Sequence, residues 1–251
     1  MIHFIRTIRR QLLDSGSLRK YLAYALGEIL LVVIGILVAM QINNWNETRK
    51  LNARMISALN EVKEDLIKDT IELNQNIKLQ KLDLAAQKRI IHVLEKKQSF
   101  TENEYRDLGR VELKREVTLI RNGFDLLKEI GLSNMNDETL RNALTTYYGK
   151  NQVEVRNEID DDKYEFEDFW IPYIRQHFKE WNFGQNAFPF DDQEINNDRT
   201  LLTEMKINLN NRNGTFRALE AAMSTAEKLI QLINKKTKYD PPLAQNPPTV
   251  D

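Results

Sequence analysis

The chain has 251 residues, of which 29% are charged, and its formal net charge is −1. Proteins that bind nucleic acid normally present a clearly basic face, so this balance gives no reason to expect a nucleic-acid partner. The sequence contains no cysteine, which excludes disulfides, thiolate metal sites and cysteine nucleophiles. Nine glycines and six prolines are few for this length, and four of the prolines lie in the last eleven residues. The composition predicts an all-α domain.

Residues 1–20 form a short basic segment. Apolar residues recur in it at helical spacing, while Arg6, Arg9 and Arg10 fall on or near the other side. A basic amphipathic segment beside a spanning helix can lie along an anionic leaflet. A solvated leader that only sets the orientation of the chain is an equally good interpretation.

Residues 21–42 read YLAYALGEILLVVIGILVAMQI, in which only Glu28 and Gln41 are strongly polar. About 20 apolar residues, each rising ~1.5 Å, cover the ~30 Å hydrocarbon core of a bilayer. The stretch therefore predicts a transmembrane helix. We favour an uncleaved signal anchor over a cleaved signal peptide, because the basic leader is long and no convincing small-residue cleavage site follows.

The charges on either side of this span predict its orientation. The flank before it carries Arg6, Arg9, Arg10, Arg19 and Lys20, and the flank after it carries Arg49, Lys50 and Arg54. Cytoplasmic flanks carry the excess of Lys and Arg, so the N-terminus is predicted in the cytoplasm and the following domain outside it.

Small residues recur at multiples of four within the span, where they allow another helix to pack closely. This candidate helix-pairing face consists of Ala23, Gly27, Glu28, Gly35 and Ala39. It predicts a homo-oligomer in which Glu28 is protonated or hydrogen-bonded to a partner. In the alternative interpretation, Glu28 reaches the headgroups and the glycines reflect ordinary membrane composition. Trp45, just beyond the span, is a candidate interfacial anchor.

A long apolar stripe follows, with spacings of three, four and seven, and predicts one helix over residues 44–97. Asp69, Gln80 and Gln87 interrupt the stripe. Thr101 and Glu104 then form a capping-box pattern, which predicts a helix that continues to residue 120. A further helix is predicted to start at residue 136 and to end at Gly149.

Residues 151–181 are predicted to form a helix or a pair of helices, kinked or divided by Pro172. Ten of the twenty-one aromatic residues lie in residues 164–190. Such clustering forms core more often than a ligand cleft or partner patch, and we interpret it as core. Residues 182–198 are predicted to be a long polar loop.

The last predicted helix has an uninterrupted 3-4 spacing, which is typical of a coiled-coil seam. The spacing runs through Leu202, Met205, Leu209, Arg212, Phe216, Leu219, Met223, Ala226, Ile230 and Ile233. Only Arg212 among these is not apolar. We predict that this helix packs antiparallel to the stripe at 51–97, which alone is long enough to match it. The proline-rich tail, residues 239–251, is predicted to be disordered.

The residues with catalytic or metal-binding chemistry form no convincing pattern. His3, His92 and His177 lie far apart in the sequence, and the acidic runs at 160–162 and 191–192 lack the alternating oxygen ligands of a calcium loop. The sequence has no phosphate-binding loop, nucleophile elbow or dinucleotide fingerprint. We therefore predict no catalytic residue, cofactor or metal.

Residues 21–47, YLAYALGEILLVVIGILVAMQINNWNE, closely resemble the opening of a family of uncharacterised single-pass membrane proteins of Gram-negative bacteria. That family is catalogued only as a domain of unknown function. A weaker likeness runs through residues 119–123 and 139–148. The resemblance implies an inner-membrane protein with a helical domain outside the cytoplasm, and it implies no activity.

Together these observations predict an all-α protein with one N-terminal transmembrane helix and an elongated antiparallel helical bundle. The predicted parts are a cytoplasmic segment at 1–20, a span at 21–42, a periplasmic bundle at 43–238 and a tail at 239–251. The leading hypothesis is a membrane-anchored module that binds other proteins, either further copies of itself or an envelope protein. The rival hypotheses are a ligand-sensing domain that signals through a partner and an envelope hydrolase that uses paired carboxylates.

Overall fold

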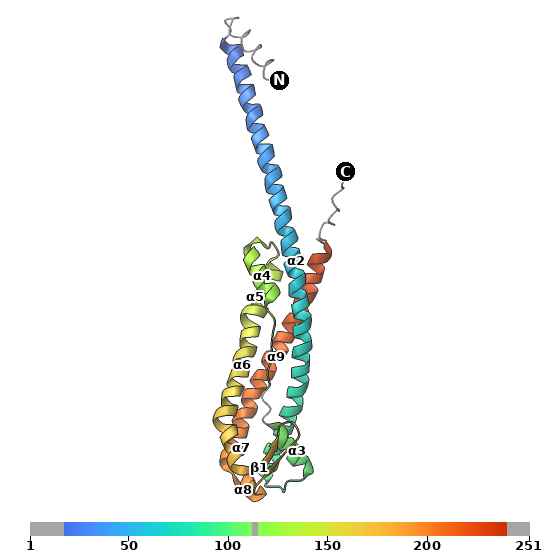
Figure 1. Ribbon diagram of the computed structural model, residues 1–251, viewed down its shortest axis with the longest axis vertical. Helices are drawn as coiled ribbons and strands as arrows, with labels where there is room; N and C mark the ends of the chain where they lie inside the picture. The colour runs from blue at the N-terminus through green and yellow to red at the C-terminus, as the bar shows by residue number, and fades with distance from the viewer. Residues whose placement is uncertain (1–17, 112–114, 240–251) are drawn as a thin grey trace. The chain divides into compact units, whose positions relative to one another are not determined.

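The computed structural model describes residues 18–111 and 115–239 (Figure 1). The chain divides into two compact units, Met1–Arg54 and Met55–Asp251, and each is described by itself. The predicted amphipathic leader, up to residue 17, and the proline-rich tail from residue 240 lie outside the described residues.

Helix α2, Leu18–Lys96, contains both the predicted span and the predicted long helix. The prediction of one helix over residues 44–97 is therefore confirmed. The sequence explains its length, because no glycine or proline occurs between Gly35 and Gly109 and both residues are the usual breakers of a helix. The first unit includes the part of α2 up to Arg54, and the second unit begins at Met55.

The second unit is built from the rest of α2 and a series of mostly short helices. They are α3 (Glu102–Val111), α4 (Asn122–Ile130), η1 (Leu132–Asn134), α5 (Glu138–Thr146), η2 (Tyr147–Asn151), α6 (Gln152–Glu165), η3 (Phe166–Trp170), α7 (Ile171–His177), α8 (Asp192–Asn197) and α9 (Arg199–Tyr239). The unit also contains one antiparallel hairpin between α7 and α8, formed by β1 (Phe178–Asn182) and β2 (Asn186–Pro189). The all-α prediction is confirmed, with this hairpin as its exception.

Helices α2 and α9 run antiparallel in this unit, as predicted. Glu95 pairs with Lys206 near one end, at 2.6 Å, and Lys81 lies 3.9 Å from Glu220 further along. Residue numbers therefore fall on α2 as they rise on α9. Helices α5 and α6 also pack on α9, and Figure 1 shows α6 alongside it.

The buried face of α9 is shifted from the predicted one. The buried positions of its heptad pattern are Leu201, Met205, Asn208, Arg212, Thr215, Leu219, Ala222, Ala226, Leu229 and Ile233. Half of the predicted positions coincide with these, and the other half, such as Leu209 and Phe216, are one residue away and half-buried. Because α9 packs against α5 and α6 as well as α2, its buried face is broader than a two-helix seam.

Two separate hydrophobic clusters stabilise the second unit. One contains residues of α2 up to Leu73 together with α4, α5 and α9 from Leu219. The other contains residues of α2 from Ile90 together with α3, α7, the hairpin and α9 up to Met205. The stretch of α2 and α9 between the clusters carries buried polar side chains, which form part of the candidate site below.

The helix predicted to continue to residue 120 ends earlier, since α3 closes at Val111 and residues 115–121 are not helical. The Arg115 side chain donates a hydrogen bond to Asp83, and the Ile120 amide donates one to Asp69. These two aspartates are fourteen residues apart on α2. That distance along α2 is about 21 Å, whereas five residues of helix rise only about 7.5 Å. An extended chain at about 3.3 Å per residue comes close to spanning it, and the long Arg115 side chain supplies the remainder.

Two π-turns replace the predicted breaks at Gly149 and Pro172. The helix predicted to end at Gly149 instead passes through η2 into α6, and η2 places the consecutive residues Tyr147 and Tyr148 both in the core. The second π-turn, η3, directly precedes α7, and Pro172 lies in the first turn of α7, where a missing amide hydrogen is tolerated.

Residues 178–198 also differ from prediction. The helix ends at His177, and the predicted polar loop contains β2 and α8. The hairpin turns at Gly184, which has a positive φ of 78°, and its second strand approaches Gly109 of α3. A Cβ at Gly109 would lie 2.5 Å from the backbone nitrogen of Asn186. Glycine is therefore required at position 109 for this close approach.

Candidate functional site

The five residues of the candidate helix-pairing face lie on α2 in the first unit, and all five are exposed. A Cβ placed on Gly27 or Gly35 would meet no described atom within 4 Å. Leu31, between these glycines, is 71% exposed. Within the first unit this face is therefore uncovered, and its pairing with another helix stays a prediction.

Of the described residues, one helix is long and apolar enough to cross a bilayer, within Ala25–Lys96. The qualifying apolar stretch has none of its residues buried. Trp45, beyond the predicted span, is 65% exposed, and the Arg49 guanidinium carbon lies 5.5 Å from its ring centroid. This cation–π pair leaves the indole accessible, as the predicted role of interfacial anchor requires.

Seven buried polar residues on α2 and α9 separate the two hydrophobic clusters, and we call them the polar layer. They are Asn76, Gln80, Asp83, Gln87, Asn208, Arg212 and Thr215. Their spacing is 4-3-4 on α2 and 4-3 on α9, so they occupy the same heptad positions as the core residues on either side. Two of the interruptions noted in the α2 stripe, Gln80 and Gln87, thus face polar partners rather than hydrophobic core.

Asp83 is the centre of the polar layer and is fully buried. Its carboxylate lies between three arginines: Arg110 Nη2 is 3.2 Å away, Arg115 Nε donates a hydrogen bond of 2.8 Å, and Arg212 Nη2 is 3.7 Å away. These arginines come from α3, the extended segment and α9. One carboxylate therefore ties three separate parts of the chain to α2.

The remaining contacts of the polar layer fix how α9 lies along α2. Arg212 donates to Gln80 Oε1 at 3.1 Å and to the Val111 carbonyl at 2.5 Å. Gln87 donates to Asn208 Oδ1 at 2.7 Å and to the Met205 carbonyl at 3.0 Å. A shift of either helix by one turn would leave these buried groups without partners, so the layer specifies the register.

Asp162 of α6 lies beside the layer. Its Oδ2 accepts a hydrogen bond of 3.0 Å from Thr215 Oγ1, and its Oδ1 is buried without a hydrogen-bond partner among the described residues. Burial raises the pKa of Asp162 to about 6, against the opposing effect of the Arg212 charge. The carboxyl group therefore gains a proton at a higher pH than an ordinary aspartate.

A second buried site, the loop clamp, consists of Asp65 and Asp69 of α2 and the residues that they hold. Asp65 Oδ2 accepts from the Gly123 amide at 2.9 Å. Asp69 Oδ1 accepts from the Ile120 amide at 2.9 Å, and its Oδ2 accepts from the Tyr147 hydroxyl at 2.7 Å. Burial raises the pKa of Asp69, although these hydrogen bonds favour its charged form. The clamp holds the chain where it enters α4.

Gly123 brings the backbone of α4 against α2. A Cβ at this position would lie 2.4 Å from the backbone nitrogen of Val62. Next to it, the rings of Phe124 and Tyr148 stack at 4.2 Å, and Arg121 donates to the Tyr148 carbonyl at 2.9 Å. Residues 119–123 and 139–148, which carry the weaker family likeness, therefore meet at the loop clamp.

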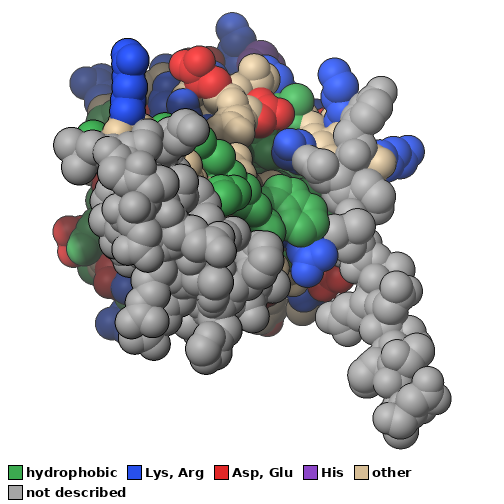
Figure 2. All heavy atoms as spheres, turned by 90° about the horizontal axis from the view of Figure 1, so that it is seen from above, with side chains coloured by type: hydrophobic (Ala, Val, Ile, Leu, Met, Phe, Trp, Pro, Cys, Tyr) green, Lys and Arg blue, Asp and Glu red, His purple; other side chains and the backbone are tan. Residues whose placement is uncertain are grey.

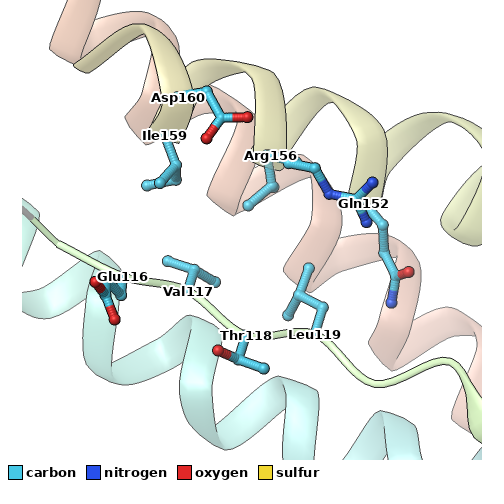
Figure 3. Close-up of a pocket in the computed structure, with 9 residues that line it drawn as sticks. Glu116, Val117, Thr118, Leu119, Gln152, Arg156, Ile159 and Asp160 are labelled. Atoms are coloured by element: carbon cyan, nitrogen blue, oxygen red, sulfur yellow. The ribbon is translucent and has the colours of Figure 1, made fainter. Parts of the chain in front are cut away.

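A groove of about 350 Å³ lies between the extended segment and α6 (Figure 3). It is lined by Glu116, Val117, Thr118, Leu119, Gln152, Val155, Arg156, Ile159 and Asp160. Val117 and Leu119 point toward α6, and Ile159 points back toward them. The groove thus has an apolar floor with charged groups at its rim.

The other candidate residues have structural roles. His177 Nδ1 lies 2.9 Å from Glu194, Asp191 caps α8 by accepting from the Gln193 amide at 2.8 Å, and Asp192 accepts from the Tyr105 hydroxyl at 2.6 Å. Within residues 18–111 and 115–239, no group of three or more His, Asp or Glu side chains is arranged to hold a metal ion.

The aromatic residues between 164 and 190 divide between core and surface. Trp170, Tyr173 and Phe178 are buried in the second hydrophobic cluster, as the core interpretation predicts, whereas Tyr164 and Phe190 are exposed. In the view of Figure 2, outside the grey atoms, both basic and acidic side chains are visible, together with hydrophobic ones. That visible area therefore carries both signs of charge.

These features define an all-α protein, and within its described residues one helix is long and apolar enough to cross a membrane. The chain belongs to DUF6090, a family of unknown function whose model matches residues 28–164, more than half of the chain. No curated protein and no solved structure matches it. The matched range begins in the predicted span and includes the loop clamp and the groove.

Proposed function

We propose that this protein is anchored in the bacterial inner membrane by α2 and that its second unit binds other proteins on the periplasmic side. The observation that carries the anchoring is the exposed apolar stretch of α2. A surface that exposes Leu26 at 66% and Leu31 at 71% is stable in contact with lipid rather than water. The charge difference between its flanks supports a cytoplasmic N-terminus.

Protease accessibility of a C-terminal epitope tests the orientation. In spheroplasts the epitope should be digested, whereas in intact cells it should be protected, and lysates serve as the digestion control. Protection in spheroplasts with digestion only after lysis would place the second unit in the cytoplasm and overturn the proposed orientation.

We also propose that the helix-pairing face joins two or more copies in the membrane. The support is the open space around Gly27 and Gly35, where an added Cβ would meet no described atom within 4 Å. Replacing both with leucine should therefore abolish disulfide crosslinking through cysteines introduced into the span, without a steric cost within the monomer. The matched control replaces Val33 and Ile36, which lie off this face, with leucine. Equal crosslinking in both variants would refute the pairing.

A further inference from the structure

The extended segment 115–121 presents backbone groups that no described residue uses. At its end, the Ile120 amide donates to Asp69 and the Ile120 carbonyl accepts from Gln152 at 3.1 Å. The backbone N–H and C=O groups of Val117, Thr118 and Leu119 have no hydrogen-bond partner among the described residues. An extended chain with an open backbone edge is a template for the addition of another strand.

The side chains of this segment alternate as those of an edge strand do. Val117 and Leu119 are half-buried and pack on the first hydrophobic cluster, whereas Thr118 is exposed. A strand added alongside would direct alternate side chains to the same side as Val117 and Leu119. On that side lies Ile159 of α6, which points toward them in Figure 3, and Val155 of α6 also lines the groove.

The size and charge of the groove indicate the kind of partner. A volume of about 350 Å³ accepts a few side chains but not a helix, whose diameter is about 10–12 Å. Arg156 at its rim is exposed and forms no ion pair with a described residue. The rim also carries the carboxylates of Glu116 and Asp160, so an incoming carboxylate is complementary only where it meets the Arg156 guanidinium.

We propose that an extended segment of a partner protein adds as a β-strand to residues 117–119. Its inward side chains are apolar ones that contact Val155 and Ile159 and, between them, an acidic one that pairs with Arg156. This inference rests on the proposed role in protein binding and assigns the binding surface to the groove.

Synthetic peptides bound to the full-length protein in detergent micelles test the proposal by fluorescence anisotropy. The probes are labelled, capped pentapeptides of sequence Val-Thr-X-Thr-Val, with Asp, Asn or Lys at X, and a fully N-methylated form of the Asp peptide. The Asp peptide should bind saturably, and N-methylation, which removes its backbone donors, should weaken binding about tenfold or more. Equal binding of the N-methylated peptide would overturn strand addition and indicate an apolar small-ligand pocket. Absence of saturable binding by all the peptides would also overturn the proposal.

A charge exchange tests the role of Arg156. Arg156→Glu should weaken binding of the Asp peptide about threefold to fivefold, the effect expected for an exposed pair, and should improve binding of the Lys peptide by a similar factor. Arg175→Glu, at an exposed position of α7, is the matched control and should change neither. An equal effect of both variants would remove Arg156 from the site.

A chain that ends at Tyr239 tests whether the groove belongs to the protein's own tail. Tighter peptide binding by this shortened chain would assign the groove to residues 240–251 and overturn the partner proposal, whereas equal binding supports it. Failure of strand addition is separable from failure of the proposed function, because the epitope and crosslinking experiments do not involve the groove.

Discussion

Asp162 offers a direct test of the polar layer, because its charge is held in a buried position. We consider Asp162→Asn, which removes the charge but keeps an oxygen that accepts from Thr215 Oγ1. The pKa of Asp162 is raised from 3.8 to about 6, and each unit of difference corresponds to about 1.4 kcal/mol. The charged form therefore costs the folded protein about 2 to 3 kcal/mol.

The sign of the effect follows from which state holds the proton more tightly. The folded protein binds it more tightly than the unfolded chain, so this group destabilises the fold at pH 8, and the penalty disappears as the pH falls from about 6 toward 4. Asparagine is neutral throughout. The variant should thus be more stable than the wild type by about 2 to 3 kcal/mol at pH 8 and nearly equal to it at pH 4.

Urea unfolding of the full-length protein in detergent micelles measures this difference, with fluorescence of the buried Trp170 as the reporter. Asp161→Asn, at the neighbouring exposed position, is the control and should change stability by less than about 0.5 kcal/mol at either pH. If Asp162→Asn destabilises the protein at pH 8, then Arg212 and Thr215 outweigh burial. If the substitution has the same effect at pH 8 and pH 4, the charge of Asp162 is not its cause. Either result would show that our reasoning is wrong.

Two further substitutions test the buried contacts by the same unfolding measurement. Gly123→Ala should lower the free energy of unfolding by about 1–3 kcal/mol, because its Cβ would approach the Val62 nitrogen to 2.4 Å and neither backbone can move freely. Gly149→Ala, whose Cβ would meet only Thr145 Cγ2 at 3.8 Å, should be neutral or slightly stabilising; equal losses in the two variants would argue against the close approach of α4 to α2. Asp83→Asn should cost about 3–5 kcal/mol, because three arginines lose their shared carboxylate. Asp160→Asn, at an exposed position of α6, should change little, and a similarly small loss for Asp83→Asn would show that solvent or other groups already compensate the arginines.

Much of the helical architecture is predictable from the sequence because it depends on local periodicity. The apolar spacing of α2 and α9 predicts both helices and their antiparallel pairing. The Thr101–Glu104 capping box is also confirmed, with the Thr101 amide donating to Glu104 Oε2 at 2.9 Å. Charged and polar interruptions such as Gln80, Gln87 and Arg212 indicate where buried polar residues replace apolar ones between α2 and α9.

The tertiary contacts that override local pattern are not predictable in this way. Helical spacing continues through residues 113–120, but the distance between Asp83 and Asp69 requires an extended chain there. The π-turn at Tyr147–Asn151 likewise results from the burial of two adjacent tyrosines. Asp65, Asp83 and Asn208 were missed as site residues because hydropathy places them at the surface. The signal available was their position on the same 3-4 repeat as buried leucines.

The separation of the two hydrophobic clusters by the polar layer has a consequence for how the second unit opens. Each cluster holds its own short elements, and among the described residues α2, α9 and the continuous helical run from α5 to α7 extend through both. We therefore expect backbone amides around Leu66 and Leu140 to exchange as one cooperative block and those around Leu108 and Trp170 to exchange as another. The end that contains the hairpin can exchange with solvent while the end that contains the loop clamp remains closed. The polar layer would then be the boundary between two halves of one helical unit that open independently.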